Sequence, residues 1–292
     1  MIRTIANYVD AFIPLRRSWR AFRAVWNARQ APMTREEWWE TILSSDGLLH
    51  WENLKFDLRH EPNTLFIRDE ILNSGEYDFR THKPCVVLDI GMNIGDTPLY
   101  FARMPNVRKV YGFEPIRATY EWAVSNFKLN PAFSSKIVPA CAAISDKTET
   151  IEIDMDYQDG TGGAAIDIVN AEHLKVIERA DYILKARAPK RKQEIRVENA
   201  SDVVRGILKD HSAEALVVKC DAEGAEWKII PTLHEDGLLQ EIAILMLEYH
   251  YKAPTDLLEM LTNAGFVCFL RDLKHVKHSE IGNIYAANSR SV

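Results

Sequence analysis

The chain has 292 residues, of which 47% are apolar and 27% are charged, and its formal net charge is −6. This composition is typical of a globular protein with a buried core. The acidic balance argues against a general nucleic-acid binder, which needs a concentrated basic face. No apolar run approaches the length of about 18 residues that a membrane-spanning helix needs. The N-terminal residues also lack the apolar stretch and cleavage site of a signal peptide, so we expect a cytoplasmic protein.

Residues 1–80 are expected to form a helical N-terminal extension or lid. Thr34 and Glu37 have the spacing of a capping box and predict the start of a helix. Between residues 1 and 30, arginines alternate with aromatic residues. This segment either contacts an anionic membrane surface peripherally or packs its aromatic side chains on the domain as a lid.

Residues 81–292 have the alternating pattern of an α/β domain. Short apolar runs without polar alternation predict strands buried on both faces. Helical patterns lie between them, which favours a doubly wound sheet with right-handed crossovers. The predicted strands are 85–90, 109–113, 136–143, 215–220, 242–247, 265–270 and 283–287, and the predicted helices are 118–129 and 227–239.

An insert at about 151–200 interrupts this alternation. Its first residues, 151–155, alternate like a half-exposed strand, and a glycine-rich loop follows at 159–163. A helix is expected over 171–184 and a basic loop over 185–192. Such insertions usually lie on the surface and shape substrate access. The four cysteines are far apart in the sequence, so we expect free, buried thiols: Cys85, Cys141, Cys220 and Cys268.

The strongest chemical motif follows the first predicted strand of the domain. The strand ends at Asp89 and runs into a loop with Gly91, Asn93 and Gly95 before a helix begins. Glycines let the backbone approach a ligand, and the helix start presents free N–H groups. Glu114 ends the next strand, where an acid can accept hydrogen bonds from ribose hydroxyls. The motif therefore predicts a nucleotide-like cofactor.

Two residues narrow the choice of cofactor. Asn93 replaces the middle glycine that dinucleotide-binding loops use to admit a pyrophosphate. Asp89 at the loop entrance would repel a pyrophosphate but would suit a cationic ligand. S-adenosylmethionine carries both an ammonium and a sulfonium, so it is the predicted cofactor.

A set of motifs in fixed order resembles the FkbM family of class I S-adenosylmethionine-dependent methyltransferases. The resemblance covers about residues 86–287 and excludes the first 80 residues and the insert. The matching motifs are DIGMNIG at 89–95, FEP at 113–115, Asn126 with Asn130, KCDAEGAE at 219–226 and EYH at 248–250.

The resemblance implies a Rossmann-like seven-stranded sheet with the insert before the fourth core strand. It also implies methyl transfer to a hydroxyl of a sugar, glycan or secondary metabolite. By motif match, Gly91, Asn93 and Gly95 would hold the methionine end of the cofactor together with Asp89. Glu114 would hold the ribose. Ala142, after the third strand, would lie near the adenine.

The stretch VKCDAEGAEW at 218–227 contains three acids with different expected roles. Asp221 ends a buried strand at the carboxyl edge of the sheet, where ligands bind in this architecture. Glu226 falls at a helix start, where a negative charge is stabilised without any functional demand, and the role of Glu223 is left open. Lys219 in the buried strand needs a partner, for which we expect Glu226 or Glu248.

The next strand ends in Glu248 and His250, which would lie on the same side if the strand continues. Histidine is largely neutral at cytoplasmic pH, so His250 is a candidate general base, unless it is only hydrogen-bonded to Glu248. His250, Asp221 and Glu248 form the predicted catalytic set. No metal is expected, although the acids Asp221, Glu223 and Glu248, together with His250, offer an alternative magnesium site that could hold a sugar diol.

The sequence therefore predicts an S-adenosylmethionine-dependent O-methyltransferase with a small-molecule or glycan acceptor. N-methylation of an amino sugar is the alternative within enzymes. A non-catalytic S-adenosylmethionine-binding module is the alternative from another class. Ribose methylation of RNA is a third option, which the acidic chain disfavours.

Overall fold

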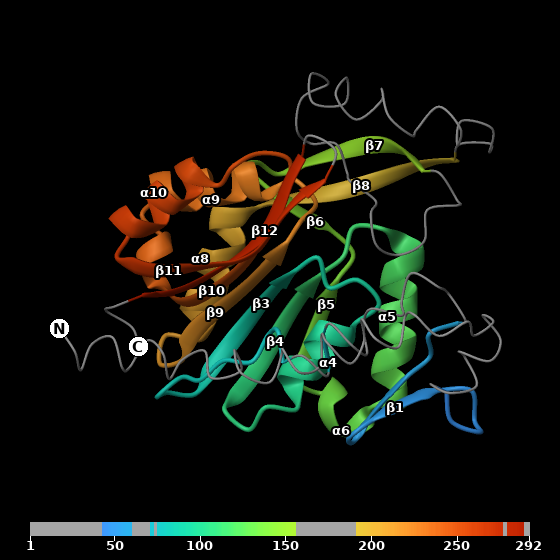
Figure 1. The fold of residues 1–292 in the computed structure, drawn as a ribbon. Coiled ribbons are helices and arrows are strands. Elements are labelled where there is room, and N and C mark those ends of the chain that lie inside the picture. Colours follow the sequence, from blue (N-terminus) through green and yellow to red (C-terminus); the bar gives the residue numbers. More distant parts are fainter. Residues whose placement is uncertain (1–42, 60–70, 73–74, 156–190, 277–278, 289–292) are drawn as a thin grey trace.

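The computed structural model describes residues 43–59, 71–72, 75–155, 191–276 and 279–288, and Figure 1 draws the others as a thin grey trace. Several predictions lie outside the described residues. They concern the helix at Thr34, the arginine- and tryptophan-rich N-terminal segment, the glycine-rich loop at 159–163 and the helix at 171–184.

A seven-stranded sheet forms the centre of the protein, with the order β11-β12-β10-β9-β3-β4-β5 (Figure 1). Five neighbouring strands are parallel, and β12 runs antiparallel to both β10 and β11. The strands are β3 (Cys85–Ile90), β4 (Val107–Phe113), β5 (Ile137–Ala140), β9 (Ala215–Asp221), β10 (Ile242–Tyr249), β11 (Phe266–Val276) and β12 (Ser279–Asn288). The chain leaves β3 toward β4 and later returns to its other side with β9. A ligand crevice is expected at such a switch point, outside the carboxyl ends of the strands.

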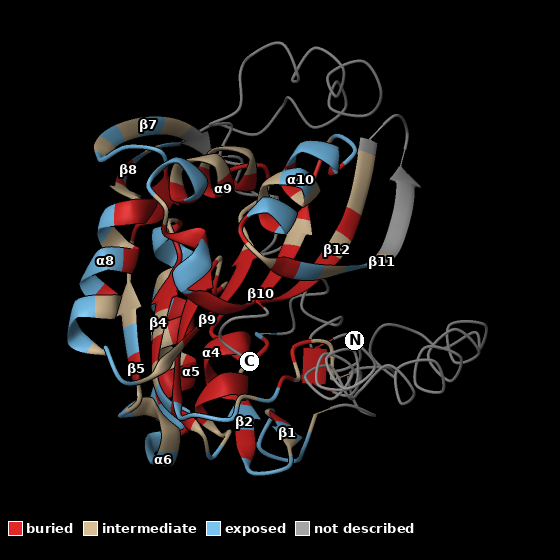
Figure 2. Ribbon diagram, turned by 90° about the vertical axis from the view of Figure 1, so that its left-hand side faces the viewer, coloured by how far each residue is buried: buried red, intermediate tan, exposed pale blue. Residues whose placement is uncertain are grey.

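Helices cover both faces of the sheet and confirm the predicted doubly wound α/β fold. One face carries α4 (Asp96–Ala102), α5 (Arg117–Leu129) and α6 (Pro131–Ser134), and the other carries α8 (Ala200–Asp210), α9 (Glu226–Glu235) and α10 (Thr255–Asn263). A short 3-10 turn, Leu239–Glu241, precedes β10. Alternate residues of β3 enter the two separate hydrophobic cores, and every residue of the strand is buried. Figure 2 shows the neighbouring central strands β9 and β10 largely in red, the colour of buried residues. Burial on both faces explains why β3 has no polar alternation in the sequence.

The prediction of a helical segment over residues 1–80 is wrong for residues 43–59. These residues form an antiparallel pair, β1 (Leu49–Trp51) and β2 (Leu54–Phe56). In β2, Leu54 and Phe56 are buried whereas Lys55 between them is exposed, as the two-residue period of a strand requires. The buried side chains join the same core as β3 and α4. This part of the N-terminal region is therefore built into the α/β domain.

Two asparagines attach this pair of strands to α5. The amide of Asn126 accepts a hydrogen bond from Asp57 N at 2.8 Å and donates one to Ile94 O at 2.9 Å. The amide of Asn130 accepts from Lys55 N at 2.9 Å and donates to Lys55 O at 2.7 Å. Asn126 is fully buried, and these bonds give it a structural role.

The described ends of the insert and a short strand before it, β6 (Ala143–Ser145), form a separate sheet in the order β6-β8-β7. The half-exposed strand predicted at 151–155 is confirmed as part of β7 (Glu149–Met155), and β8 (Arg191–Asn199) pairs with it antiparallel. The predicted strand 136–143 instead breaks after β5, and β6 (Ala143–Ser145) leaves the central sheet to pair with β8. β8 thus includes residues that we had expected in a basic loop.

The cysteines and helices agree with two further expectations. All four cysteines are free, although only Cys85 and Cys220 are buried and the other two are half-buried. Among the helices in the described part of the chain, none has both the length and the apolar character needed to cross a membrane.

Candidate functional site

The loop between β3 and α4 has an unusual backbone that requires small residues. Gly91, Asn93 and Gly95 have positive φ angles of 80°, 47° and 86°. A Cβ on Gly91 would lie 1.9 Å from the carbonyl oxygen of Asp221, and a Cβ on Gly95 would lie 2.5 Å from the Phe127 ring. Glycine at 91 therefore lets the loop press directly against the carboxyl end of β9.

Lys219 and Asp89 form a buried ion pair beneath this loop. The Asp89 carboxylate is fully buried, accepts a hydrogen bond from the Thr97 hydroxyl at 2.6 Å and lies 3.3 Å from Lys219 Nζ. Lys219 Nζ also donates to Gly91 O at 2.5 Å and lies 3.8 Å from an Asp221 oxygen. Burial alone would lower the pKa of Lys219, but Asp89 and Asp221 outweigh it and raise that pKa. Lys219 is therefore a cation that fixes the loop.

The predicted partners of Lys219 are wrong, because the register of the sheet decides the pairing. Asp89 of β3 lies opposite Lys219 of β9, so both side chains share the face covered by α4. Glu226 points elsewhere and pairs with His250. Sequence spacing within one strand could not show this neighbour in another strand.

Glu114 lies directly after β4 and beside the glycine loop. Its carboxylate accepts a hydrogen bond from Ile116 N at 2.9 Å, and its exposed fraction is only 7%. Burial raises its pKa to about 8. A carboxylate has about four acceptor positions, so the backbone donors of Ile116 and Asn93 leave room for hydroxyl donors of a ligand. Its place and chemistry fit the ribose contact predicted from the sequence.

Asp96, the first residue of α4, is a buried acid that sequence analysis did not select. One carboxylate oxygen, Oδ1, has no hydrogen-bond partner among the described residues. Burial raises the pKa of Asp96 to about 7. Its charge therefore costs free energy in the ligand-free fold.

Replacing Asp96 by asparagine is expected to stabilise the ligand-free protein at high pH. The pKa of Asp96 is higher in the folded state than its ordinary value of 3.8, so the folded state holds the proton more tightly. The wild type then loses stability as pH rises from about 4 through about 7, and Asp96→Asn does not share this loss. Urea unfolding should show a gain of about 2–4 kcal/mol at pH 8 and a smaller gain at pH 4.5. An equal difference at both pH values would contradict the assignment.

Ala142, the predicted adenine neighbour, lies between β5 and β6 and is fully buried. It packs in the same core as Phe113, at the end of β4. Its contact with a ligand stays a prediction.

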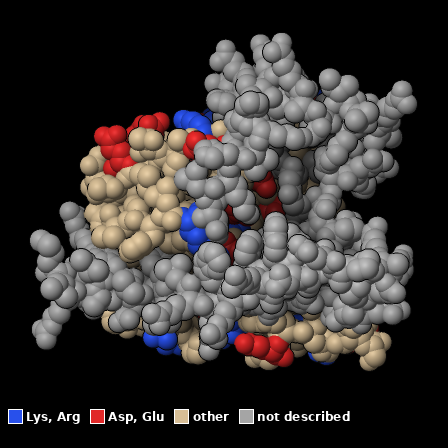
Figure 3. Space-filling view, viewed as in Figure 1, with Lys and Arg blue, Asp and Glu red and all other residues tan. Residues whose placement is uncertain are grey.

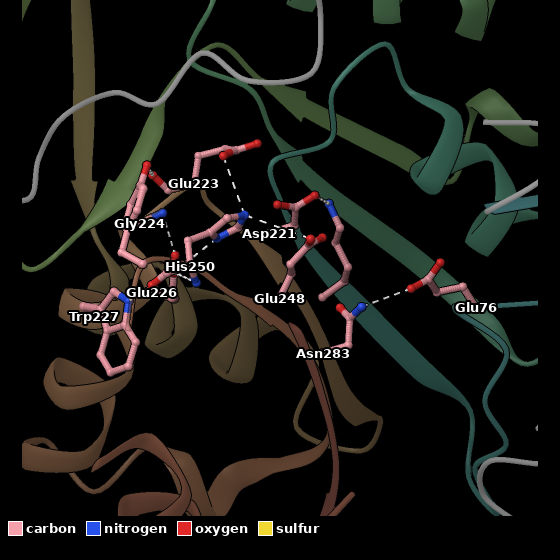
Figure 4. A network of polar contacts seen from close by, with 11 residues as sticks. Glu76, Asp221, Glu223, Gly224, Glu226, Trp227, Glu248, His250 and Asn283 are labelled. Atoms are coloured by element: carbon pink, nitrogen blue, oxygen red, sulfur yellow. Dashed lines mark hydrogen bonds and ion pairs between the residues drawn. The ribbon is translucent and has the colours of Figure 1, made fainter. Parts of the chain in front are cut away.

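A cluster of acids around His250 occupies the neighbouring part of the sheet edge (Figure 4). Glu248 of β10 lies opposite Asp221 of β9 in the register, and His250 follows Glu248 by two residues. Glu223 stands in the loop between β9 and α9, where its φ is 49°. In the orientation of Figure 1, acidic atoms are seen near the middle of the molecule (Figure 3). The structure thus brings together Asp221, Glu223, Glu248 and His250.

The carboxylate of Glu226 connects the loop after β9 to His250 through hydrogen bonds. This carboxylate is fully buried and accepts hydrogen bonds from Gly224 N at 2.7 Å and from His250 N at 2.8 Å. It also lies 3.2 Å from His250 Nδ1. Its role is structural, as predicted, but it acts through these bonds rather than as a simple helix-start charge.

His250 is surrounded by negative charge. Its Nε2 lies 3.5 Å from Glu223 and 4.0 Å from Glu248. Burial would lower the pKa of His250, but the hydrogen bond to Glu226 and the charge of Glu223 outweigh it and raise the pKa to about 10. The ring is therefore protonated at neutral pH in this arrangement. The neutral ring assumed for the predicted general base does not occur here.

A group of side chains that no sequence motif indicates lies on the other side of the cluster. Glu76 accepts a hydrogen bond from Asn283 Nδ2 at 3.3 Å (Figure 4). It accepts another from Tyr285 Oη at 3.3 Å. Tyr77 is buried, and its ring centroid lies 5.9 Å from Lys219 Nζ. These residues belong to no recognised motif, and only the fold brings residue 76 beside β12.

Comparison with known proteins gives a family and several distant structural similarities. The methyltransferase FkbM domain matches residues 89–268, which is more than half of the chain. The search of curated proteins found no match. Among solved structures, an FkbM methyltransferase from Methylobacillus flagellatus KT is similar at 16% identity and a TM-score of 0.42, covering 76% of this chain and 47% of that one. The chain thus spans about half the length of that protein.

Two other solved structures show how distant these similarities are. Precorrin-6y C5,15-methyltransferase from Geobacter metallireducens GS-15 is similar at 11% identity and a TM-score of 0.37. The match covers 72% of this chain and 82% of that protein's chain. Magnesium protoporphyrin IX methyltransferase from Synechocystis PCC 6803 was solved with bound S-adenosylmethionine. It is similar at 10% identity and a TM-score of 0.35, and the match covers 70% of this chain and 71% of that protein's chain. The family match includes the glycine loop, Glu114 and the acids around His250, and the chain belongs to the methyltransferase FkbM domain family.

Proposed function

We propose that the protein is an S-adenosylmethionine-dependent O-methyltransferase that acts on a hydroxyl of a sugar, glycan or other small metabolite. The observation that carries the proposal is the direct contact between the glycine loop and the acid cluster. Gly91 packs so closely on the Asp221 backbone that a Cβ would lie 1.9 Å from its carbonyl oxygen. A cofactor on the loop and an acceptor on the cluster would therefore meet at the same sheet edge.

The residues of the loop fit the cofactor in distinct ways. The backbone of Gly91, Asn93 and Gly95 would line its methionine end, and Glu114 would accept hydrogen bonds from its ribose. Asp89 is buried against Thr97 and Lys219, so it would shape the loop rather than contact the ligand. When bound, S-adenosylmethionine supplies a methyl group already activated by a positive sulfur.

The acid cluster would position the acceptor for an in-line displacement, in which positioning supplies much of the rate. The acceptor oxygen forms its bond to the methyl carbon while the carbon–sulfur bond breaks and its electron pair stays on sulfur. The hydroxyl proton passes to Glu248, which we propose as the base. Burial and the charge of Asp221 raise the pKa of Glu248 to about 8, so transfer should become faster as the pH rises to about 8 and Glu248 loses its proton. Its side chain is 29% exposed, and it lies opposite Asp221 in the register of the sheet.

The charge of the cluster favours some acceptors over others. Asp221, Glu223 and Glu248 would repel an anionic acceptor but can accept hydrogen bonds from several hydroxyls. The same charge would attract an amino sugar, so N-methylation of an amino sugar is the second candidate.

The experiment is a transfer assay with methyl-labelled S-adenosylmethionine and matched acceptors. Each hydroxylated sugar or metabolite is paired with its amino counterpart, and RNA is included. We expect label on a hydroxyl compound, with release of S-adenosylhomocysteine. Label on amino acceptors alone would favour the second candidate, and label on RNA would contradict the proposed acceptor class. Binding of the cofactor without transfer to any acceptor would support a non-catalytic module.

His250→Ala is expected to lower kcat by about 100-fold because the acceptor side of the site loses a group that fixes its geometry. The affinity for S-adenosylmethionine should not change, since His250 does not touch the glycine loop in the proposed arrangement. His50→Ala, which removes a surface histidine paired with Asp46, is the control and should keep full activity. If His250→Ala turned over at the wild-type rate, the proposed role of His250 in the site would be contradicted.

A further inference from the structure

We infer that the sheet edge holds one divalent first-row metal ion, with Asp221, Glu223 and His250 as its ligands. This inference rests on the proposed function and adds a means of binding the acceptor. One potential ligand atom from each of the three residues lies within 4.8 Å of the other two. Two carboxylate oxygens and one imidazole nitrogen are a ligand set that metal sites use.

The orientation of His250 is a separate observation that favours a metal. The residue is only 5% exposed, and its Nδ1 lies 3.2 Å from the fully buried Glu226 carboxylate. Metal-binding histidines usually donate their second ring N–H to a carboxylate in this way, which fixes the ring. Glu226 also accepts a hydrogen bond from His250 N at 2.8 Å, so backbone and ring are held by one group.

The other ring nitrogen, Nε2, is directed into the cluster (Figure 4). It forms ion pairs with Glu223 at 3.5 Å and with Glu248 at 4.0 Å. These distances are longer than a close hydrogen bond, and one ion could bind between the nitrogen and the oxygens. A divalent cation bound there would displace the proton from Nε2 and contact the nitrogen and the oxygens together.

The proposed ion differs from the magnesium considered from the sequence, for which Asp221, Glu223, Glu248 and His250 were the possible ligands. Magnesium prefers oxygen ligands and retains several waters, whereas imidazole suits first-row transition metals. Of these four residues, Asp221, Glu223 and His250 bring ligand atoms within 4.8 Å of one another. We therefore expect Mn²⁺ or a similar ion, and Glu248 remains available as the proton acceptor.

Three protein ligands would leave positions open on the ion. The backbone of Asp221 lies against Gly91 of the glycine loop, so these positions are next to the proposed cofactor site. Two neighbouring hydroxyls of an acceptor could occupy them. The ion would then polarise the hydroxyl that is methylated and hold it in place.

The test measures Mn²⁺ binding by the full chain, from which bound metal has first been removed with a chelator. Mn²⁺ is then added, and the electron paramagnetic resonance signal of the free ion reports how much is bound. We expect one ion per chain. His250→Ala and Glu223→Gln should each weaken binding at least tenfold, and Glu226→Gln should weaken it by about 10–100-fold through the ligand it orients. His50→Ala removes a surface histidine–carboxylate pair and should bind Mn²⁺ as the wild type does. Circular dichroism checks that each variant is folded.

Two outcomes would overturn the metal site. One is a folded wild type that binds no Mn²⁺, and the other is equal binding by the wild type and both ligand variants. Cofactor binding and methyl transfer measured with and without chelator separate this inference from the proposed function. If methyl transfer continues after the chelator has removed the metal, the role of the metal is refuted and the methyltransferase proposal stands. If the chain binds Mn²⁺ but not the cofactor, the methyltransferase proposal is refuted and the metal site stands.

Discussion

Lys219→Met is expected to destabilise the folded protein by about 3–5 kcal/mol, the usual cost of removing one partner from a buried ion pair. Lys219 is 2% exposed and Asp89 is fully buried, so water cannot replace the lost cation. The variant would leave Asp89 with only the Thr97 hydroxyl as a partner among the described side chains. It would also remove the hydrogen bond to Gly91 O that fixes the glycine loop.

Urea unfolding of the wild type and the variant at pH 8 and pH 5 measures this effect. The loss should be smaller at pH 5, because without Lys219 the buried Asp89 is more readily protonated and then needs no cation. Lys147→Met is the matched control, since Lys147 pairs with Glu149 at 3.1 Å but its side chain is 59% exposed. An exposed pair of this kind contributes at most about 1 kcal/mol. If Lys219→Met also lost no more than about 1 kcal/mol of stability, the buried ion pair between Lys219 and Asp89 would be refuted.

Gly91→Ala is expected to disrupt the loop that would hold the cofactor. Its Cβ would lie 1.9 Å from the Asp221 carbonyl oxygen, so the loop or β9 would have to move. The positive φ of 80° adds about 1–2 kcal/mol of backbone strain, and overpacking typically costs a further 1–3 kcal/mol. Affinity for S-adenosylmethionine should fall as well, because the loop and the sheet edge lose their relative position.

Gly47→Ala separates the clash from the backbone strain. Gly47 has a similar φ of 76°, but a Cβ there would meet no atom within 4 Å. It should lose only the stability that the backbone conformation costs and should keep its cofactor affinity. Calorimetric titration and urea unfolding of both variants give the comparison. Equal losses in the two variants would show that the contact between Gly91 and Asp221 is not important.

Much of the fold could be predicted because the core strands are buried on both faces. Continuous apolar runs such as CVVLDI at 85–90 appear as β3 with the predicted limits. The strands β1 and β2 were missed because each has only three residues, too few to establish a period. The break after β5 was missed for a related reason, since residues 141–143 remain apolar where the chain leaves the sheet.

The candidate site could be predicted as a list of residues but not as a set of contacts. Glycines and acids at strand ends mark the loop and the cluster, because parallel strands present their carboxyl ends at one edge. The pairing of Lys219 with Asp89 depends on the register between β9 and β3, which one strand's sequence does not contain. The charge state of His250 depends on Glu226 and Glu223, whose distances to the ring only the fold determines.

We claim that the glycine loop and Glu114 bind S-adenosylmethionine beside the acid cluster, and calorimetric titration with this cofactor can establish whether they do. We expect one molecule per wild-type chain and at least about tenfold weaker binding by Glu114→Ala, because the variant would lose hydrogen bonds to the ribose hydroxyls that contribute about 0.5–1.5 kcal/mol each. His50→Ala should bind like the wild type. A folded wild type that does not bind the cofactor, or a Glu114→Ala variant that binds it equally well, would contradict the claim.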